Sequence, residues 1–133
     1  MKSRAVAIVR QDDSVLLIHR RKDGVEYYTL PGGGVEEGET PEQACVRELA
    51  EETGLSAAVE SPLLTLDNAG RTEHYFVMGP ATGTPRLGGP ESERDGEDNQ
   101  YRLVWVPLAE AADVGLKPAA IAPHLVEIAG NVR

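Results

Sequence analysis

Three glutamates crowd a single turn of a predicted helix. Glu48, Glu51 and Glu52 stand three and four positions apart in the stretch RELAEETGL, and on a helix such side chains are neighbours about 5–6 Å apart whose like charges repel. A divalent cation would turn this repulsion into ligation, because Mg²⁺ takes hard oxygen ligands and is commonly held by carboxylates together with substrate phosphates. Taken alone, these residues are also compatible with a solvated acidic helix face.

A glycine-rich acidic stretch, PGGGVEEGE, comes directly before this helix. We expect it to form a loop, because a run of glycines is unfavourable in regular elements. Backbone amides and carbonyls that no side chain covers can approach an ion or a phosphate closely. The loop and the acidic helix together therefore predict a metal-assisted phosphate site.

The helix that carries the glutamates has clear predicted limits. Thr40 is a good N-cap, Pro41 suits the first helical position, and Gln43 completes a capping box with Thr40. Gly54 stands where a left-handed C-cap belongs, so we expect a helix over Pro41–Thr53. Its apolar stripe consists of small residues that would let it lie close to a sheet: Ala44, Cys45, Leu49 and Ala50.

With these residues and spacings, the chain resembles the Nudix family. The family signature reads G, five residues, E, seven residues, R-E-aliphatic, one residue, E-E, one residue, G-aliphatic. It is filled here without departure at Gly33, Glu39, Arg47, Glu48, Leu49, Glu51, Glu52, Gly54 and Leu55. The preceding LPGG, the flanking strand-like runs and the chain length also suit such a domain.

The resemblance implies a fold and a reaction. The expected fold is an α/β/α sandwich with a mixed sheet and a catalytic loop-helix-loop, forming one domain over residues 1–133. The implied reaction is attack of water on a pyrophosphate phosphorus in a nucleoside diphosphate linked to another moiety, with Mg²⁺ or Mn²⁺ as cofactor. The alternative is a catalytically silent Nudix-like module that binds a nucleotide as a sensor or interaction domain.

The resemblance also implies roles for single residues. Glu48 and Glu52 would be the principal metal ligands, with Glu51 as a further ligand or water-positioning carboxylate. The Gly32 carbonyl would be a backbone ligand, and Arg47 would hold a glutamate in place. Glu48, Glu51 and an acid of a later loop all remain candidates for the general base. The motif residues expected to be structural are Gly33, Glu39 and Gly54.

Strand-like runs rich in Val and Ile surround the motif. We expect strands near Ala5–Val9, Val15–His19, Glu26–Leu30, Ala57–Leu66, His74–Met78 and Arg102–Val106, then a short helix from Pro107 and a helix near Ile121–Ala129. The long stretch GPATGTPRLGGPESERDGEDNQ exceeds the usual connection and is expected to be functional or mobile. Its Glu93 or Glu97 could supply a further metal ligand or base, or these acids could serve only to keep the loop soluble. Arg20 and Arg21, at a strand end, could reach substrate phosphates or be ordinary solubilising charges.

Composition limits the classes of partner. The net charge of −9 argues against attraction to nucleic acid backbones or anionic membranes, so a polyphosphate ligand needs bridging cations. The first apolar runs are short and separated by Asp12 and Asp13, which is unlike a signal peptide or a membrane span. We therefore expect a cytoplasmic monomer or homodimer that acts on a small-molecule nucleotide.

The histidines, the cysteine and two aromatic residues are expected to have structural roles. His19, His74 and His124 show no spacing typical of a ligand set. The lone cysteine, Cys45, cannot form an internal disulfide and is expected to be a small buried hydrophobe. Tyr101 and Trp105 could stack on a base, but core packing is the favoured role. In the family that the chain resembles, members that remove oxidised guanine nucleotides often use an Asn near the last helix, and the stretch LKPAAIAPHLVEI has none. The resemblance leaves a nucleoside triphosphate or a small nucleotide conjugate as the first choice of substrate.

Overall fold

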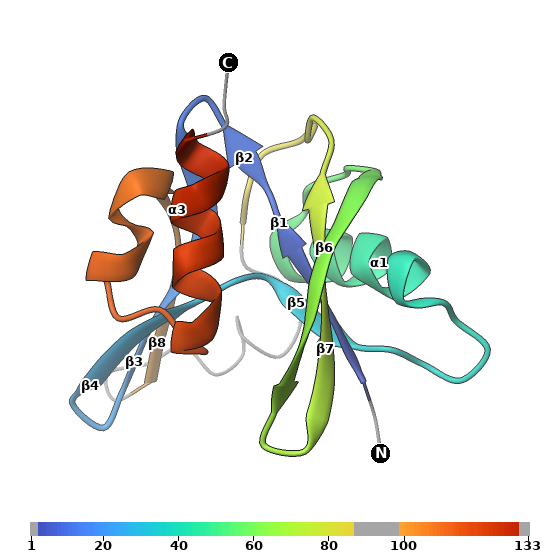
Figure 1. Ribbon diagram of the computed structural model, residues 1–133, viewed down its shortest axis with the longest axis horizontal. Coiled ribbons are helices and arrows are strands. Elements are labelled where there is room, and N and C mark those ends of the chain that lie inside the picture. Colours follow the sequence, from blue (N-terminus) through green and yellow to red (C-terminus); the bar gives the residue numbers. More distant parts are fainter. Residues whose placement is uncertain (1–2, 87–98, 131–133) are drawn as a thin grey trace.

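The computed structural model describes residues 3–86 and 99–130 of the chain. Two four-stranded sheets form the middle of the molecule, with one long helix on one side and a short helix with 3₁₀ turns on the other (Figure 1). One of the sheets mixes parallel and antiparallel pairs. The α/β/α arrangement with a mixed sheet that the sequence predicted is therefore confirmed.

The first sheet holds the glycine-rich segment. Its strands, in spatial order, are β5 (Gly32–Gly34), β1 (Arg4–Ile8), β7 (Arg71–Met78) and β6 (Val59–Asn68). β1 pairs parallel with β7 and antiparallel with β5. The prediction that no regular element would include the glycines was wrong, because Gly32–Gly34 form a short strand. Glycine is needed there since a Cβ on Gly32 would lie 2.4 Å from the Ala5 carbonyl oxygen.

The second sheet is antiparallel. In it β3 (Ser14–Lys22) pairs on one edge with β8 (Asn99–Pro107), and on the other with β2 (Arg10–Gln11) and β4 (Val25–Thr29). β8 begins at Asn99, so the end of the stretch that the sequence marked as one long loop belongs to a strand. The expected Glu93 and Glu97 lie outside the described residues.

The helix α1 (Pro41–Thr53) begins and ends as its sequence predicted. The Thr40 hydroxyl accepts from the Gln43 backbone amide, and the Gln43 side chain accepts from the Thr40 amide in return. Gly54 adopts the left-handed conformation at φ 78° and closes the helix on the Ala50 carbonyl. The capping box and the C-cap are thus confirmed, and they fix the turn that carries the glutamates.

Two hydrophobic clusters lie on either side of the sheets. Side chains alternate along β1, so Val6 and Ile8 face one cluster while Ala5 and Ala7 face the other. The first cluster also receives side chains from η1 (Leu108–Asp113), η2 (Ala119–Ile121) and α3 (Ala122–Gly130). The second receives the small apolar stripe of α1. Both faces of β1 are buried, which explains why Ala5 to Ile8 are all apolar.

The predicted burial of single residues had mixed outcomes. Cys45 is fully buried with its Sγ 3.7 Å from the Met78 Sδ, and burial raises the pKa of its thiol to about 12, which confirms its packing role. Tyr101 is buried as expected, but Trp105 is 37% exposed, so core packing was wrong for the tryptophan. Among the described residues, no helix is both long and apolar enough to cross a membrane.

Candidate active site

Close contact between β5 and α1 forms the centre of the candidate site. The Gly32 amide donates to the Glu52 Oε1 at 3.0 Å, and Glu52 is only 8% exposed. A Cβ built on Gly33 would lie 2.2–2.5 Å from the carboxylate atoms of Glu48. The two glycines therefore allow the carboxylates of one helix face to lie directly against a strand backbone.

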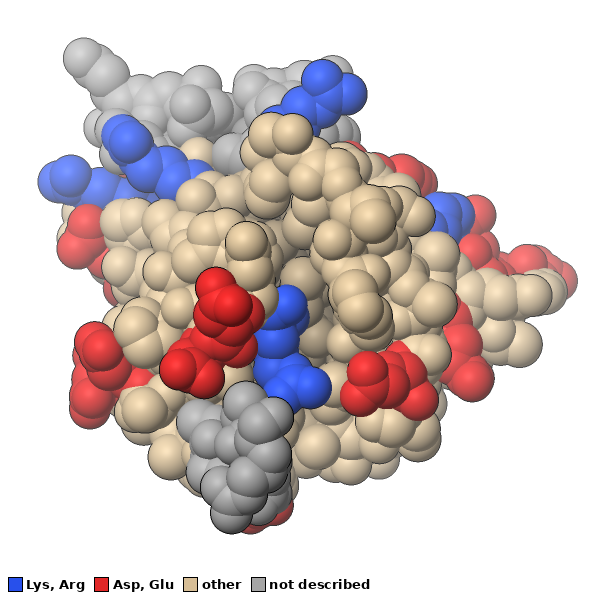
Figure 2. Space-filling view, turned by 90° about the horizontal axis from the view of Figure 1, so that it is seen from above, with Lys and Arg blue, Asp and Glu red and all other residues tan. Residues whose placement is uncertain are grey.

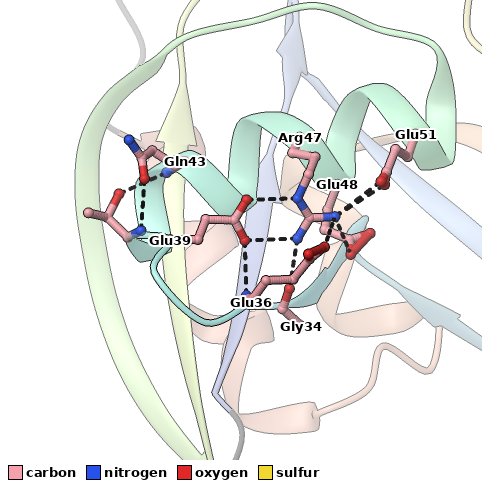
Figure 3. A network of polar contacts seen from close by, with 8 residues as sticks. Gly34, Glu36, Glu39, Gln43, Arg47, Glu48 and Glu51 are labelled. Carbon is pink, nitrogen blue, oxygen red and sulfur yellow. Dashed lines mark hydrogen bonds and ion pairs between the residues drawn. The ribbon is translucent and has the colours of Figure 1, made fainter.

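Arg47 is the hub of a polar network on the same helix (Figure 3). Its Nε and one terminal nitrogen donate to the two oxygens of Glu39 at 2.7 and 2.9 Å. Its other terminal nitrogen contacts Glu51 at 3.1 Å and Glu48 at 3.2 Å. A further bond reaches the Gly34 carbonyl at 3.0 Å. One guanidinium thus fixes the positions of three motif carboxylates relative to β5.

The acidic loop before α1 is held by the same network. Glu39 accepts from the Glu36 backbone amide at 3.0 Å, and the Glu36 carboxylate lies 3.5 Å from Arg47. The hydrogen bonds from Arg47 and then from the Glu36 amide lower the pKa of Glu39 from 4.5 to about 2. In return, Glu39 raises the pKa of Arg47 further. Both groups therefore stay charged at neutral pH, which keeps the loop fastened to the helix.

The chemistry of these donors fits a divalent cation. Carboxylates from α1 and backbone groups of β5 offer hard oxygens of the kind that Mg²⁺ and Mn²⁺ prefer. In the present geometry Glu48 and Glu51 face Arg47, while Glu52 faces the Gly32 amide. Within residues 3–86 and 99–130, no three His, Cys, Asp or Glu side chains are grouped to hold a metal ion. The oxygen atoms of these residues suit a divalent cation. In this structure the carboxylates bind Arg47 and the Gly32 amide instead.

A cleft rich in basic residues leads to these carboxylates. It consists of two adjacent hollows of about 200 and 250 Å³ that share four residues: Arg4, Arg20, Thr29 and Leu30. The first hollow reaches Gly32 and Glu52 of the motif. The second extends to Arg71 and Lys117. Cationic side chains therefore line a path that ends at the acidic helix face.

One buried carboxylate lies in the wall of this cleft. Glu73 is 4% exposed and accepts from the Tyr75 hydroxyl at 2.8 Å and from the Asn68 amide at 3.3 Å. The Arg4 Nε lies 3.7 Å from it, since β1 and β7 run parallel with Arg4 opposite Glu73. Burial, followed by the hydrogen bond to Glu73, raises the pKa of Tyr75. The Tyr75 phenol therefore keeps its proton and donates it in the hydrogen bond to Glu73.

The two arginines at the strand end differ in position. Arg20 lines both hollows, and its guanidinium lies 4.8 Å from the Tyr101 ring centroid and 5.6 Å from that of Tyr27. Its Nε is shielded from solvent and has no hydrogen-bond partner within residues 3–86 and 99–130. Arg21 is exposed and does not line either hollow, as expected for consecutive residues of a strand.

The sequence analysis missed several residues of the cleft. These are Arg4, Arg71, Glu73, Tyr75 and Lys117. Alternation along the strand offered one signal, because Arg71, Glu73 and Tyr75 stand two apart and thus share a face. The pairing that brings Arg4 to Glu73 joins distant parts of the chain, so no local pattern could have revealed it.

The fold is that of a known class of protein. A family model described as NUDIX domain matches residues 1–126. The chain therefore belongs to the Nudix hydrolase family, whose members generally use divalent metal ions and act on small nucleotide substrates.

Individual relatives agree with this assignment. The chain is 36% identical over 114 residues to an ADP-ribose pyrophosphatase of Mycobacterium tuberculosis, covering 81% of this chain and 54% of that protein. It is 46% identical over 55 residues to an 8-oxo-dGTP diphosphatase of Escherichia coli, covering 39% and 43%. The solution structure of the E. coli ORF135 protein matches with a TM-score of 0.70 and 30% identity, over 96% of this chain and 86% of that one. The chain spans about half the length of these two curated relatives.

Proposed function

We propose that this domain hydrolyses a pyrophosphate bond in a nucleoside diphosphate linked to another moiety, with Mg²⁺ or Mn²⁺ as cofactor. The substrate is a nucleoside triphosphate or a small nucleotide conjugate. The observation that carries the proposal is the continuity of the basic cleft with Gly32 and Glu52. A protein of net charge −9 needs cations where it binds a polyanion, and the cleft supplies Arg4, Arg20, Arg71 and Lys117.

Glu48, Glu52 and the Gly32 carbonyl would hold the metal, with Glu51 as a further ligand or as the group that positions water. When bound, the cation neutralises charge on the phosphoryl oxygens and lowers the pKa of a bound water. Arg47 holds Glu48 and Glu51 by hydrogen bonds, so it acts as a positioning residue. The proposed general base is Glu48 or Glu51, or an acid such as Glu93 or Glu97.

Arg20 is the proposed phosphate contact. Two tyrosine rings flank its guanidinium, and such cation–π contacts contribute about 0.5–1 kcal/mol or more at partly shielded sites. They restrict the side chain before substrate arrives, and a guanidinium donates paired hydrogen bonds to anionic oxygens. The exposed Arg21 has no comparable restraint, so we assign phosphate binding to Arg20 ahead of Arg21.

A hydrolysis screen with Mg²⁺ tests the proposal. The panel should hold nucleoside triphosphates including oxidised ones, ADP-ribose, nucleotide sugars, dinucleoside polyphosphates and coenzyme A, with the products identified. The expected result is one substrate class with kcat/KM above about 10⁴ M⁻¹s⁻¹. Uniformly negligible turnover with nucleotide binding retained would overturn the proposal in favour of a nucleotide-binding sensor.

A further inference from the structure

A second hollow lies away from the basic cleft. It has a volume of about 260 Å³ and is lined by residues of β2 and β8, of the segment after β7, and by Leu55 just beyond the Gly54 cap of α1. Its lining residues are Arg10, Gln11, Leu55, Pro80, Ala81, Gly83, Pro85 and Trp105. None of them lines the two hollows of the basic cleft. Figure 2 shows the molecule from above, where basic side chains lie in the middle of the face with acidic side chains on both sides of them.

Arg10 is the charged group of this hollow. Its Nε is shielded from solvent and has no hydrogen-bond partner, and no ion pair to its guanidinium is present among the described residues. A buried donor without an acceptor destabilises the folded chain. A guanidinium binds carboxylate or phosphate oxygens through paired hydrogen bonds. The hollow therefore offers an unused site for an anionic group.

Trp105 supplies the apolar surface. It is the only tryptophan of the chain and is 37% exposed, although its strand neighbours Leu103 and Leu16 pack in the cluster below α1. An indole ring in a pocket wall offers a flat face on which a planar ring can stack. Leu55 and two prolines complete the apolar part of the wall.

The part of the wall formed by the segment after β7 is fixed in place by backbone hydrogen bonds. Ser56 and Thr82 exchange two such bonds at 2.9 Å, and the Arg86 amide donates to the Thr53 carbonyl at 2.8 Å. These bonds tie the segment after β7 to the end of α1. Pro80 and Pro85 further restrict its backbone. A preformed wall lowers the entropy cost of binding, so the hollow is suited to a small ligand.

We propose that this hollow binds a small ligand made of a planar aromatic ring with one anionic group, such as an aromatic carboxylate or a nucleoside monophosphate. Arg10 would bind the anion and Trp105 would stack on the ring. Asp12 and Asp13, exposed just after Gln11, would repel a more highly charged ligand, which favours a single anionic group. The volume lies just below the usual range for ligand pockets, about 300–1,000 Å³, and this excludes a large conjugate.

The fluorescence of Trp105 reports on this hollow directly, without any activity assay. The full chain, without metal, should be titrated with two matched pairs: benzoate against benzamide, and AMP against adenosine. We expect saturable quenching in which at least one anion binds about tenfold or more tightly than its neutral counterpart. If neither anion binds more tightly than its neutral counterpart, the proposal is overturned.

Variants assign the binding to this hollow. Arg10→Gln should weaken binding of the anion about tenfold, to the level of the neutral compound, whereas the exposed Arg102→Gln should change it less than twofold. Arg20→Gln, a change in the basic cleft, should also leave the affinity within twofold. Unchanged anion affinity in Arg10→Gln, or a tenfold loss in Arg20→Gln, would contradict the proposal. Should Arg10→Gln fail to fold, calorimetric titration of Trp105→Leu replaces it, with the same tenfold loss expected.

Discussion

The carboxylate of Glu48 occupies the space that a side chain at Gly33 would need. A Cβ on Gly33 would lie 2.2 Å from the Glu48 carboxyl carbon. Glu48 can therefore keep its position only because residue 33 has no side chain. Gly33 itself pairs with Ala5 in the sheet. The motif glycine and the motif glutamate are therefore two halves of one packing contact between β5 and α1.

Gly33→Ala should displace Glu48 and lower activity. Because the obstacle is a side-chain end rather than backbone, the variant should fold, with a loss of about 1–3 kcal/mol of unfolding free energy, as for overpacking. Denaturant unfolding measures the stability, and hydrolysis rates with increasing Mg²⁺ measure the effect on the metal site. Gly34→Ala is the matched control, since a Cβ there meets nothing within 4 Å. Equal behaviour of the two variants would contradict the packing account.

Arg47→Lys should lower kcat/KM by about 10–100-fold, the usual range for residues that orient metal ligands. A lysine keeps the charge but cannot bind both oxygens of Glu39 while also reaching Glu48 and Glu51. The comparison with Arg102→Lys, an exposed arginine of β8, controls for the loss of a guanidinium. Normal turnover in Arg47→Lys would show that charge alone is sufficient.

Glu39 should make stability depend on acid pH. Its pKa is lowered from 4.5 to about 2 in the folded chain, so the unfolded chain binds the proton more readily. The stabilisation is then complete above about pH 4.5 and is lost as the pH falls from there towards 2. Urea unfolding at several pH values should show this loss in the native chain, a smaller loss in Glu39→Gln and an unchanged one in the exposed Glu60→Gln. Identical acid profiles for all three would contradict the assigned ion pair.

Local chemistry explains which features the sequence could predict. The limits of α1 followed from Thr40, Gln43 and Gly54, whose effects act within a few residues. The strand at Gly32–Gly34 was missed because its pairing depends on close approach to Ala5, far away in the chain. The basic cleft was missed for the same reason, as parallel pairing brings Arg4 opposite Glu73.

The exposure of Trp105 illustrates a second limit. Its strand is amphipathic and its type favours burial, so a core role was the reasonable expectation. The ring lines a hollow together with residues of β2 and of the segment after β7, and a local sequence pattern does not encode such long-range neighbours.

The most direct test of the proposed function compares hydrolysis by the native chain and Glu52→Gln, with Mg²⁺ titrated after treatment with EDTA. The glutamine can still accept from the Gly32 amide, so the fold should persist while the charged ligand is lost. We expect EDTA to abolish turnover, Mg²⁺ or Mn²⁺ to restore it, and Glu52→Gln to lose at least about 100-fold in kcat/KM, or about 2.7 kcal/mol. Glu42→Gln, on the first turn of the same helix, should retain activity. Near-normal, metal-independent turnover in Glu52→Gln would contradict the account.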